Sequence, residues 1–366
     1  MNNTREPLFH ISKRDQLSGA KVWSIRILAI ILALILCGLI TVLLTKLNPV
    51  EVYGTMLKGG FGSKRKTWVT IQNTAILLLV ALAVTPAFKM RFWNIGAEGQ
   101  VLMGSWAAAA VMIKLTDKVP EHFMMLLMVL AAVACGAVWA AIPAFFKAKW
   151  DTNETLFTLM MNYIATQIVA CYAIIWENPK GSGTIGIINN ASEFGWMQVG
   201  NKYLLPIIVA VIMVIFSYIY MNFTKHGYEI AVVGESEHTA RYIGINVRKV
   251  MIRTLLLSGA ICGLVGLLLV GAINHTLTTT LAGGRGFTAV MVSWMSQFNP
   301  ITMIVTSLLI VFLDRGAGEI ATAFSLNTSF SDILTGIIIF FIIGCEFFIR
   351  YKLSFRSKEK KEENRK

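Results

Sequence analysis

The stretch FWNIGAEGQ, from Phe92 to Gln100, places one carboxylate, two amides and two glycines between long apolar runs. The uncharged run that follows, Gly99 to Ile113, is 15 residues long. At 1.5 Å per residue, a helix of that length is shorter than a bilayer core of roughly 30 Å. A helix that began at Phe92 would be long enough, but it would hold Glu98 inside the membrane. A carboxylate at that depth costs about 3 kcal/mol, so it is usually functional or buried against protein.

The composition around this stretch is that of a membrane protein. Hydrophobic residues make up 55% of the chain and charged residues 14%, whereas soluble domains contain about 25% charged residues. Several uncharged runs are long enough to cross a bilayer as helices, and none has the charged face that a soluble helix needs. The sequence therefore predicts an all-α polytopic membrane protein. The runs are Ile27–Thr45, Thr67–Phe88, Phe123–Phe146, Thr155–Trp176, Tyr203–Thr224 and Thr254–Asn274.

The last part of the chain is less regular, and we expect about 8–10 transmembrane helices in total. Residues 286–313 carry no charge, but Asn299-Pro300 interrupts them. Proline lacks a backbone donor, and the residue before it avoids helical geometry. We therefore predict a broken or re-entrant segment near residues 286–313, either two short pieces or a hairpin. Ile333–Ile349 is the last apolar run.

The positions of Lys and Arg suggest an orientation. With both termini in the cytoplasm, about two thirds of these residues fall on the cytoplasmic side, as the positive-inside rule requires. Residues 1–26 then form a cytoplasmic N-terminal segment, residues 27–350 the transmembrane domain and residues 351–366 a charged cytoplasmic tail. These loops and the tail explain the net charge of +13, so nucleic acid is not needed as a partner. The first apolar run is too long for a signal peptide, and we expect it to be retained.

Motifs for chemistry are missing from the sequence. It contains no GK dipeptide, so it has no P-loop for ATP, and no GxSxG pattern. The five cysteines are scattered through apolar runs, and the five histidines are not spaced as pairs of metal ligands. We therefore expect no catalytic, cofactor-binding or metal-binding residues, no cofactor, and a chain that is not an enzyme.

A polar segment, residues 225–253, separates two of the later apolar runs. Ser236 is a good N-cap and Gly244 a good C-terminal stop, which predicts a helix of about two turns, Glu237–Ile243. A helix this short is marginal alone, so Ala240 and Ile243 should pack against neighbours or a partner. The segment is either a plain connecting loop or the element that receives force from a soluble motor. The residues alone leave both interpretations open.

Several motifs resemble those of permease subunits of bacterial ABC importers, in the nucleoside and simple-sugar branch of the branched-chain amino acid/ribose permease family. The stretch from Phe92 to Gln100 is the most specific of them. The others follow in the same order and together cover about residues 48–350. They are Asn48-Pro49 with Gly60–Ser63, Asn153-Glu154 with Leu159–Ala165, Gly234 with Ala240–Ile245, and Gly284–Thr288 with Asn299-Pro300.

The resemblance implies a multi-pass protein of a bacterial cell membrane and a set of partners. These are a cytoplasmic ABC ATPase subunit, a second permease subunit that is a different chain, and an extracytoplasmic substrate-binding protein. The implied cargo is a nucleoside. The matching positions for contact with the ATPase are Gly234, Glu235, Ala240, Arg241 and Gly244. Glu235 and Thr239 replace the usual Asn and Ala, so the particular ATPase is not specified. Trp93 is a separate departure, because a smaller or aliphatic residue is common at that position.

A nucleoside is neutral and polar, so a path for it should offer amides, hydroxyls and aromatic faces rather than fixed charge. The candidates beside apolar runs are Asn73, Asn94, Glu98, Gln100, Asn162 and Tyr163. For Glu98 we favour a plainer role, in which it accepts hydrogen bonds from backbone N–H groups at a broken helix. Gly259 and Gly263 form a GxxxG pattern, which we interpret as packing within this chain rather than against a second permease.

Two other functions are compatible with these residues. One is a secondary transporter in which Glu98 couples transport to protons or sodium ions. The other is a membrane scaffold without transport activity. Uptake by this chain alone would favour the former, and the lack of any cargo would favour the latter.

Overall fold

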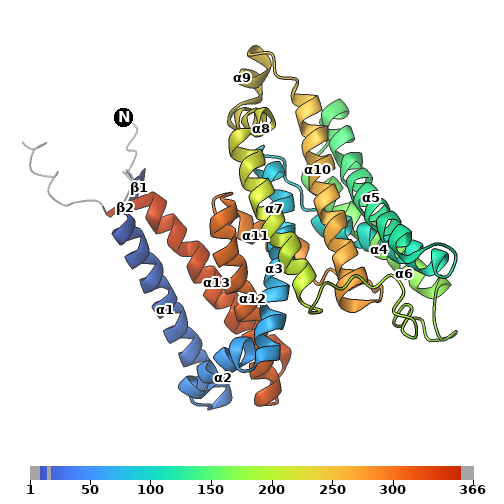
Figure 1. The fold of residues 1–366 in the computed structure, drawn as a ribbon. Coiled ribbons are helices and arrows are strands. Elements are labelled where there is room, and N and C mark those ends of the chain that lie inside the picture. The colour runs from blue at the N-terminus through green and yellow to red at the C-terminus, as the bar shows by residue number, and fades with distance from the viewer. Residues whose placement is uncertain (1–8, 15–17, 356–366) are drawn as a thin grey trace, which may run out of the picture. The chain divides into compact units, whose positions relative to one another are not determined.

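The computed structural model describes residues 9–14 and 18–355. The protein is an all-α polytopic membrane protein, as predicted. Within the described residues, seven helices are long and apolar enough to cross a membrane. One further apolar stretch, Ile333–Ile349 in α13 (Thr328–Arg350), is shorter, and with it the count reaches the lower end of the expected range of 8–10. Helix α4 (Ala97–Leu115) is not among these helices. The chain divides into two compact units, one made of residues up to Ser63 and from Phe312, the other of Lys64–Val311 (Figure 1).

The first unit contains α1 (Gly19–Thr45), α2 (Pro49–Phe61), the end of α12 (Pro300–Ala323) and α13. Helices α1 and α13 pack against each other. Two short strands, β1 (Phe9–Lys13) and β2 (Tyr351–Phe355), pair antiparallel with Ser12 opposite Lys352. This pairing was not predicted, and it places the segments that enter α1 and leave α13 side by side.

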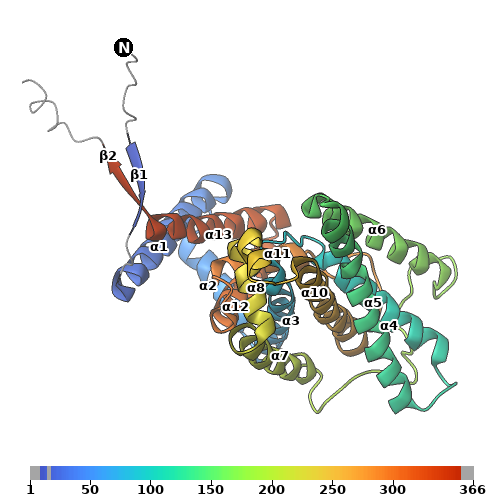
Figure 2. The same cartoon turned by 90° about the horizontal axis from the view of Figure 1, so that it is seen from above.

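The second unit is built around α3 (Lys64–Lys89) and α10 (Val247–Leu268), the two long helices with most of their apolar windows buried. A π-helical turn, η1 (Leu269–Asn274), continues α10. Helix α10 lies between α3 and α5 (Glu121–Trp150) and also contacts α4 (Figure 2). A Cβ atom on Gly259 would overlap the carbonyl oxygen of Gly136 in α5, so the GxxxG pattern packs within this chain, as expected.

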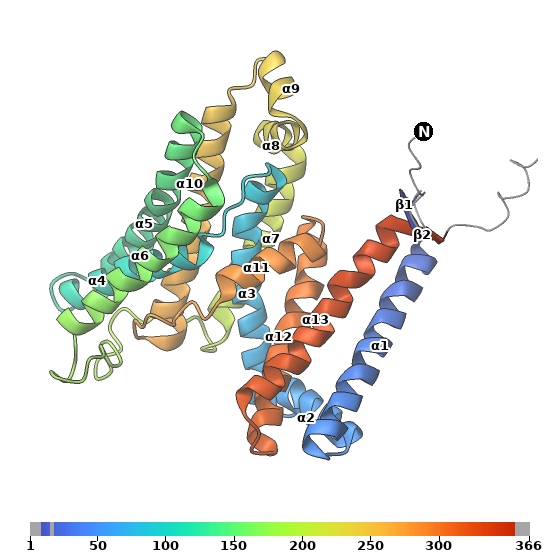
Figure 3. The same cartoon turned by 180° about the vertical axis from the view of Figure 1, so that it is seen from behind.

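The remaining helices of this unit are α6 (Glu154–Ile175), α7 (Leu204–Phe223), α8 (Lys225–Glu235), α9 (Glu237–Tyr242) and α11 (Arg285–Met295). Helix α9 lies at the same end of the unit as the junction between α5 and α6 (Figure 3). The prediction missed α8, whose N-cap is Thr224; the side chain of Thr224 accepts a hydrogen bond from Gly227 N–H.

The segment near residues 286–313 is broken, as predicted: α11 ends at Met295 and α12 begins at Pro300. The expectation of two short pieces is wrong for the second piece, because α12 continues through Asp314 and Arg315 to Ala323. Those two residues end the uncharged run in the sequence. Charged side chains end the apolar run, but they do not end the helix, because Asp and Arg can both remain in helical backbone.

Candidate functional site

The stretch from Phe92 to Gln100 joins α3 to α4. Helix α3 ends at Lys89, and Arg91 adopts a left-handed conformation with φ of 62°. The N–H of Phe92 then donates to the carbonyl of Ala87 at 2.9 Å. The chain continues without regular structure to Gly96, the N-cap of α4. Backbone groups in such a segment lack helical partners, so side chains must satisfy them where it is buried.

Asn94 is the centre of the first group of hydrogen bonds and is fully buried. Its Oδ1 accepts from Gly96 N–H and from Gln100 Nε2, both at 3.1 Å, and its Nδ2 donates to Ser258 Oγ in α10 at 3.2 Å. The segment is thereby joined to α4 and α10. Gln100 is also buried, and its Oε1 has no partner among the described residues.

Asn162 joins the same segment to α6. Its Nδ2 donates to the carbonyl of Ile95 at 2.9 Å, and its Oδ1 accepts from Gly99 N–H at 2.8 Å. A Cβ atom on Gly99 would lie only 3.0 Å from the Cα of Asn162, so the glycine permits this close approach. The side-chain amide of Asn162 therefore serves as hydrogen-bond partner for one backbone carbonyl just before α4 and for one backbone N–H in its first turn.

Glu98 joins the segment to the beginning of α11. One carboxylate oxygen accepts from Gly284 N–H and the other from Gly286 N–H, both at 2.7 Å. The first N–H groups of a helix lack helical partners and carry partial positive charge, so they suit a carboxylate. Gly284 is the N-cap, with φ of 73°, and a Cβ atom on Gly286 would lie 2.8 Å from the Cα of Glu98. Glu98 thus accepts hydrogen bonds from backbone N–H groups at a broken helix, which is the role favoured for it from the sequence.

Aromatic rings join the other end of α11 to the same segment. The indoles of Trp93 and Trp294 stack with centroids 5.6 Å apart, and both contact Phe88 edge to face. Trp294 lies in the last turn of α11. The stretch from Phe92 to Gln100 therefore contacts α11 near both of its ends.

The other candidate path residues lie outside this group of contacts. Asn73 is half-buried in α3, where its Oδ1 accepts from the Arg285 guanidinium at 3.2 Å. Tyr163 is 61% exposed on α6, next to Asn162, which is buried. The structure thus brings Asn94, Glu98, Gln100 and Asn162 together, places Asn73 beside the residue that starts α11, and leaves Tyr163 apart. Sequence reasoning missed Ser258 and Arg285.

Residues 225–253 form a second candidate site. Gly234 in α8 is buried, and a Cβ atom there would overlap the carbonyl oxygen of Lys89 at the end of α3. Arg253 of α10 forms an ion pair with Glu229 of α8 at 2.8 Å. Helix α8 therefore packs against α3 and α10. Its contact with α3 is at Lys89, shortly before the stretch that begins at Phe92.

The short helix α9 has the predicted caps. Ser236 Oγ accepts from Thr239 N–H at 3.2 Å, and Gly244 has φ of 84°, the left-handed conformation that favours glycine. Ala240 is buried, as predicted, whereas Ile243 is 51% exposed, so its packing against neighbours in this chain is not found and its contact with a partner stays a prediction. The chain turns at Gly244, and Ile245 N–H bonds to the carbonyl of Ala240, so Ile245 makes the apolar contact instead.

The exposed surface of α9 is polar except for its end. Glu237 and Arg241 form an ion pair at 3.0 Å along the helix, and Glu235 is exposed just before it. Tyr242 is 92% exposed. Together, the exposed side chains of Tyr242 and Ile243 form an uncovered apolar surface at the C-terminal end of α9.

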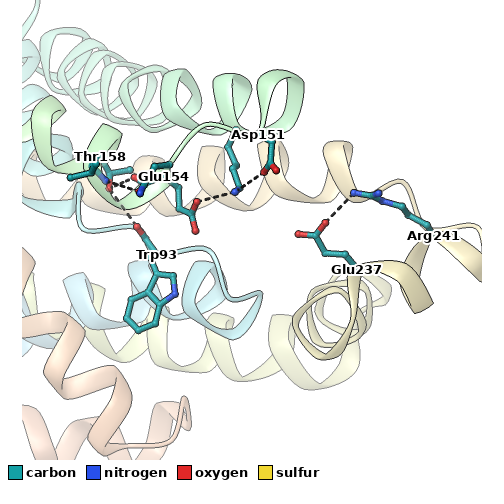
Figure 4. A network of polar contacts seen from close by, with 9 residues as sticks. Trp93, Asp151, Glu154, Thr158, Glu237 and Arg241 are labelled. Atoms are coloured by element: carbon teal, nitrogen blue, oxygen red, sulfur yellow. Dashed lines mark hydrogen bonds and ion pairs between the residues drawn. The ribbon is translucent and has the colours of Figure 1, made fainter.

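A third group of polar contacts lies where α5 meets α6 (Figure 4). Lys147 bridges Asp151 at 2.7 Å and Glu154 at 3.0 Å, and its ammonium holds the pKa of Asp151 below the usual range. Thr158 Oγ1 donates to the carbonyl of Glu154 and accepts from Ile95 N–H. The junction between α5 and α6 is thus connected to the Phe92–Gln100 stretch. Asp151 follows Lys147 by four residues, a spacing at which helical side chains meet, but sequence reasoning did not use it, and Glu154 belongs to the next helix.

Broken helices that meet around buried amides, within a bundle of apolar helices, are characteristic of membrane transporters. A family model, the branched-chain amino acid transport system / permease component, matches residues 69–343, so the chain belongs to this family. It is an ABC transporter permease of the nucleoside and sugar type.

Three relatives show the range of this family. The glucose ABC transporter permease protein TsgB13 of Haloferax volcanii is 29% identical, and the alignment covers 88% of each chain. The guanosine ABC transporter permease protein NupP of Bacillus subtilis is 27% identical over 86% of this chain and 91% of its own. The nucleoside ABC transporter permease protein NupB of Lactococcus lactis is also 27% identical, over 84% of this chain and 87% of its own. All three are transporter subunits, which is consistent with a chain that is not an enzyme.

Proposed function

We propose that this chain is the membrane-spanning permease subunit of an ATP-driven importer and forms half of the path for a small polar solute. A separate ATPase would drive it through residues 225–253. The observation that carries this proposal is the buried contact of Gly234 with Lys89, because it connects the exposed α9 region to the stretch beginning at Phe92. Movement of α8 would therefore reach the group of buried amides directly.

The cargo that we propose is a nucleoside. Two of the three relatives are named for guanosine or nucleosides, and the third is named for glucose, so a sugar is the second candidate. Both solutes are neutral and need hydrogen bonds to replace those made with water. Asn94 and Gln100 are fully buried and bonded to each other, so they would shape the path rather than line it. Among the candidates, we propose that the half-buried Asn73 contacts the cargo.

The partners follow from the same proposal. A cytoplasmic ABC ATPase would dock at α9 through Gly234, Glu235, Ala240, Arg241 and Gly244 or the surfaces that they support. A different permease chain would complete the path, and an extracytoplasmic binding protein would deliver the cargo. The protein would lie in a bacterial cell membrane with both termini in the cytoplasm.

The alternative, ion-coupled transport through Glu98, has no support from the relatives. Both oxygens of Glu98 are engaged by backbone N–H groups. A proton or sodium ion bound there would have to compete with the start of α11. We therefore favour a structural role for this carboxylate.

Reconstitution tests the proposed function. The chain is placed in liposomes alone, or together with the ATPase, second permease and binding protein encoded beside it, and uptake of labelled nucleosides and pentoses is measured. We expect ATP-dependent nucleoside uptake by the complete set and none by the chain alone. Accumulation by the chain alone that stops when an ion gradient is dissipated would support the alternative instead.

A further inference from the structure

Helix α5 is longer than a bilayer core. Its 30 residues span about 45 Å at 1.5 Å per residue, against a hydrocarbon core of roughly 30 Å. A tilt of about 20° shortens that span only slightly. Because the uncharged run of α5 ends at Phe146, we expect the last turn, Lys147 to Trp150, at the level of the lipid headgroups.

The two lysines of this last turn have different surroundings. Residues two positions apart point about 200° apart around a helix, so Lys147 and Lys149 face opposite ways. Lys147 is bonded to Asp151 and Glu154. Lys149 is exposed and forms no ion pair with the residues that the structure describes, and its ammonium lies 4.5 Å from the centre of the Trp150 ring and 5.7 Å from that of Phe145.

The rings around Lys149 form a continuous exposed surface. Phe145 and Trp150 contact edge to face with centroids 5.8 Å apart, and Phe146 lies 5.1 Å from Trp150. Phe146 also contacts Phe157 of α6 at 5.1 Å. Phe145 and Trp150 are each about half exposed. Trp and Lys at helix ends are the residues that proteins place at the boundary between hydrocarbon and headgroups.

We propose that Lys149, with the rings of Phe145, Phe146 and Trp150, binds the headgroup of an anionic phospholipid. The phosphate would contact the ammonium of Lys149, and the acyl chains would lie along the rings. Charge complementarity supports a lipid rather than an apolar protein surface, because Lys149 carries a positive charge that is not neutralised. The acidic residues closest to it in the sequence, Asp151 and Glu154, are bonded to Lys147. Each basic residue near an anionic surface contributes about 1 kcal/mol, which is roughly fivefold in affinity.

This position would make transport sensitive to lipid composition. The junction between α5 and α6 is connected through Glu154 and Thr158 to Ile95 in the Phe92–Gln100 stretch. A headgroup held at Lys149 would limit the movement of that junction relative to the membrane surface. The binding itself depends only on the protein spanning a membrane and does not require the proposed cargo or ATPase.

Lipid titration of the purified full-length protein tests the proposal. Native mass spectrometry in detergent measures binding of phosphatidylglycerol and of phosphatidylcholine to the wild type and to Lys149→Gln, Lys149→Arg and Trp150→Leu. We expect Lys149→Gln to lose about fivefold in phosphatidylglycerol affinity with phosphatidylcholine unchanged, and Lys149→Arg to retain the preference. Trp150→Leu should weaken both lipids. The matched control is Lys118→Gln, an exposed lysine near the opposite end of α5, which should change neither.

Three results would overturn the proposal. Unchanged phosphatidylglycerol binding by Lys149→Gln would show that the ammonium does not contact the headgroup. An equal loss of both lipids in Lys149→Gln would show apolar adsorption without recognition of charge. Protection of Lys149 from amine labelling by a second protein subunit, with no effect of lipid, would assign this surface to a protein contact.

Discussion

Glu98 shows how one side chain can connect two broken helices. Its oxygens each accept one N–H at the start of α11, and hydrogen bonds to a charged group are worth about 1.5–3 kcal/mol. In Glu98→Gln, one oxygen remains an acceptor, but the new NH2 group opposes the second N–H. We expect a loss of stability of about 2 kcal/mol and strongly reduced uptake, measured by thermal unfolding and in proteoliposomes. Asp117→Asn, an exposed loop change, serves as control, and unchanged unfolding and uptake in Glu98→Gln would contradict this role.

Gly234 is a residue at which any side chain should be disruptive. Its Cβ would overlap the carbonyl of Lys89, so Gly234→Ala must move α8 away from the end of α3. We expect an assembled transporter with uptake reduced more than tenfold, because movement of α8 would no longer reach the Phe92–Gln100 stretch. The ratio of uptake to ATP hydrolysis is the measurement. An unchanged ratio would show that this contact does not carry the coupling.

Gly244 tests conformation rather than space. A Cβ atom there would meet nothing within 4 Å, but its φ of 84° costs other residues roughly 1–2 kcal/mol. Asn tolerates this conformation better than β-branched residues do. We predict that Gly244→Val uncouples ATP hydrolysis from uptake and that Gly244→Asn largely preserves it. Equal behaviour of the two variants would argue against a conformational role.

At the scale of elements, the segment between α6 and α7 is held to the end of η1 by a stacked pair. His275 stacks on Trp196 with ring centroids 3.8 Å apart, and its carbonyl accepts from Ile188 N–H. Burial lowers the pKa of His275, although Glu193 opposes this shift. The folded state therefore resists protonation. The stability contributed by neutral His275 is complete above about pH 6.5 and decreases as the pH falls below that value.

This pH dependence can be measured by hydrogen exchange. Between pH 7.5 and 5.5, after correction for the intrinsic rate, we expect protection of residues 185–197 to decrease in the wild type. In His275→Gln it should be independent of pH over that range. A pH-dependent loss that persists in His275→Gln would assign the effect to another group.

Predictions from the sequence succeeded where they depended on local backbone geometry and failed where they depended on which face of a helix points inward. Asn162 and Tyr163 are adjacent in α6 and therefore point about 100° apart, so they could not both face the buried amides. The sequence does not specify which face of an uncharged helix is turned inward. It did indicate the break at Asn299-Pro300 and the caps of α9, because those depend on local backbone geometry. The Lys147–Asp151 pair has the i,i+4 spacing of helix neighbours, but the contact of Lys147 with Glu154 depends on the turn between α5 and α6, which the sequence does not specify.

At the scale of the whole molecule, the pairing of β1 with β2 joins the two described ends of the chain. Ser12 and Lys352 are directly opposite, and opposite residues of antiparallel strands lie within reach of a disulfide. We predict that Ser12→Cys with Lys352→Cys forms a disulfide rapidly under mild oxidation, detected as a mobility shift. The control, Ser12→Cys with Ser354→Cys, is two positions out of register and should react slowly. Equal rates would contradict the register.

Helix α11 is attached near both ends to the same nine residues, by Glu98 at its start and by Trp93 at its close. Two attachments remove the freedom to pivot about either one. A displacement delivered through Lys89 would therefore carry α11 along as a rigid body, turning it with the start of α4 instead of bending it. If the ATPase acts through α8 as proposed, a push at the surface of the protein would become a rotation in its interior.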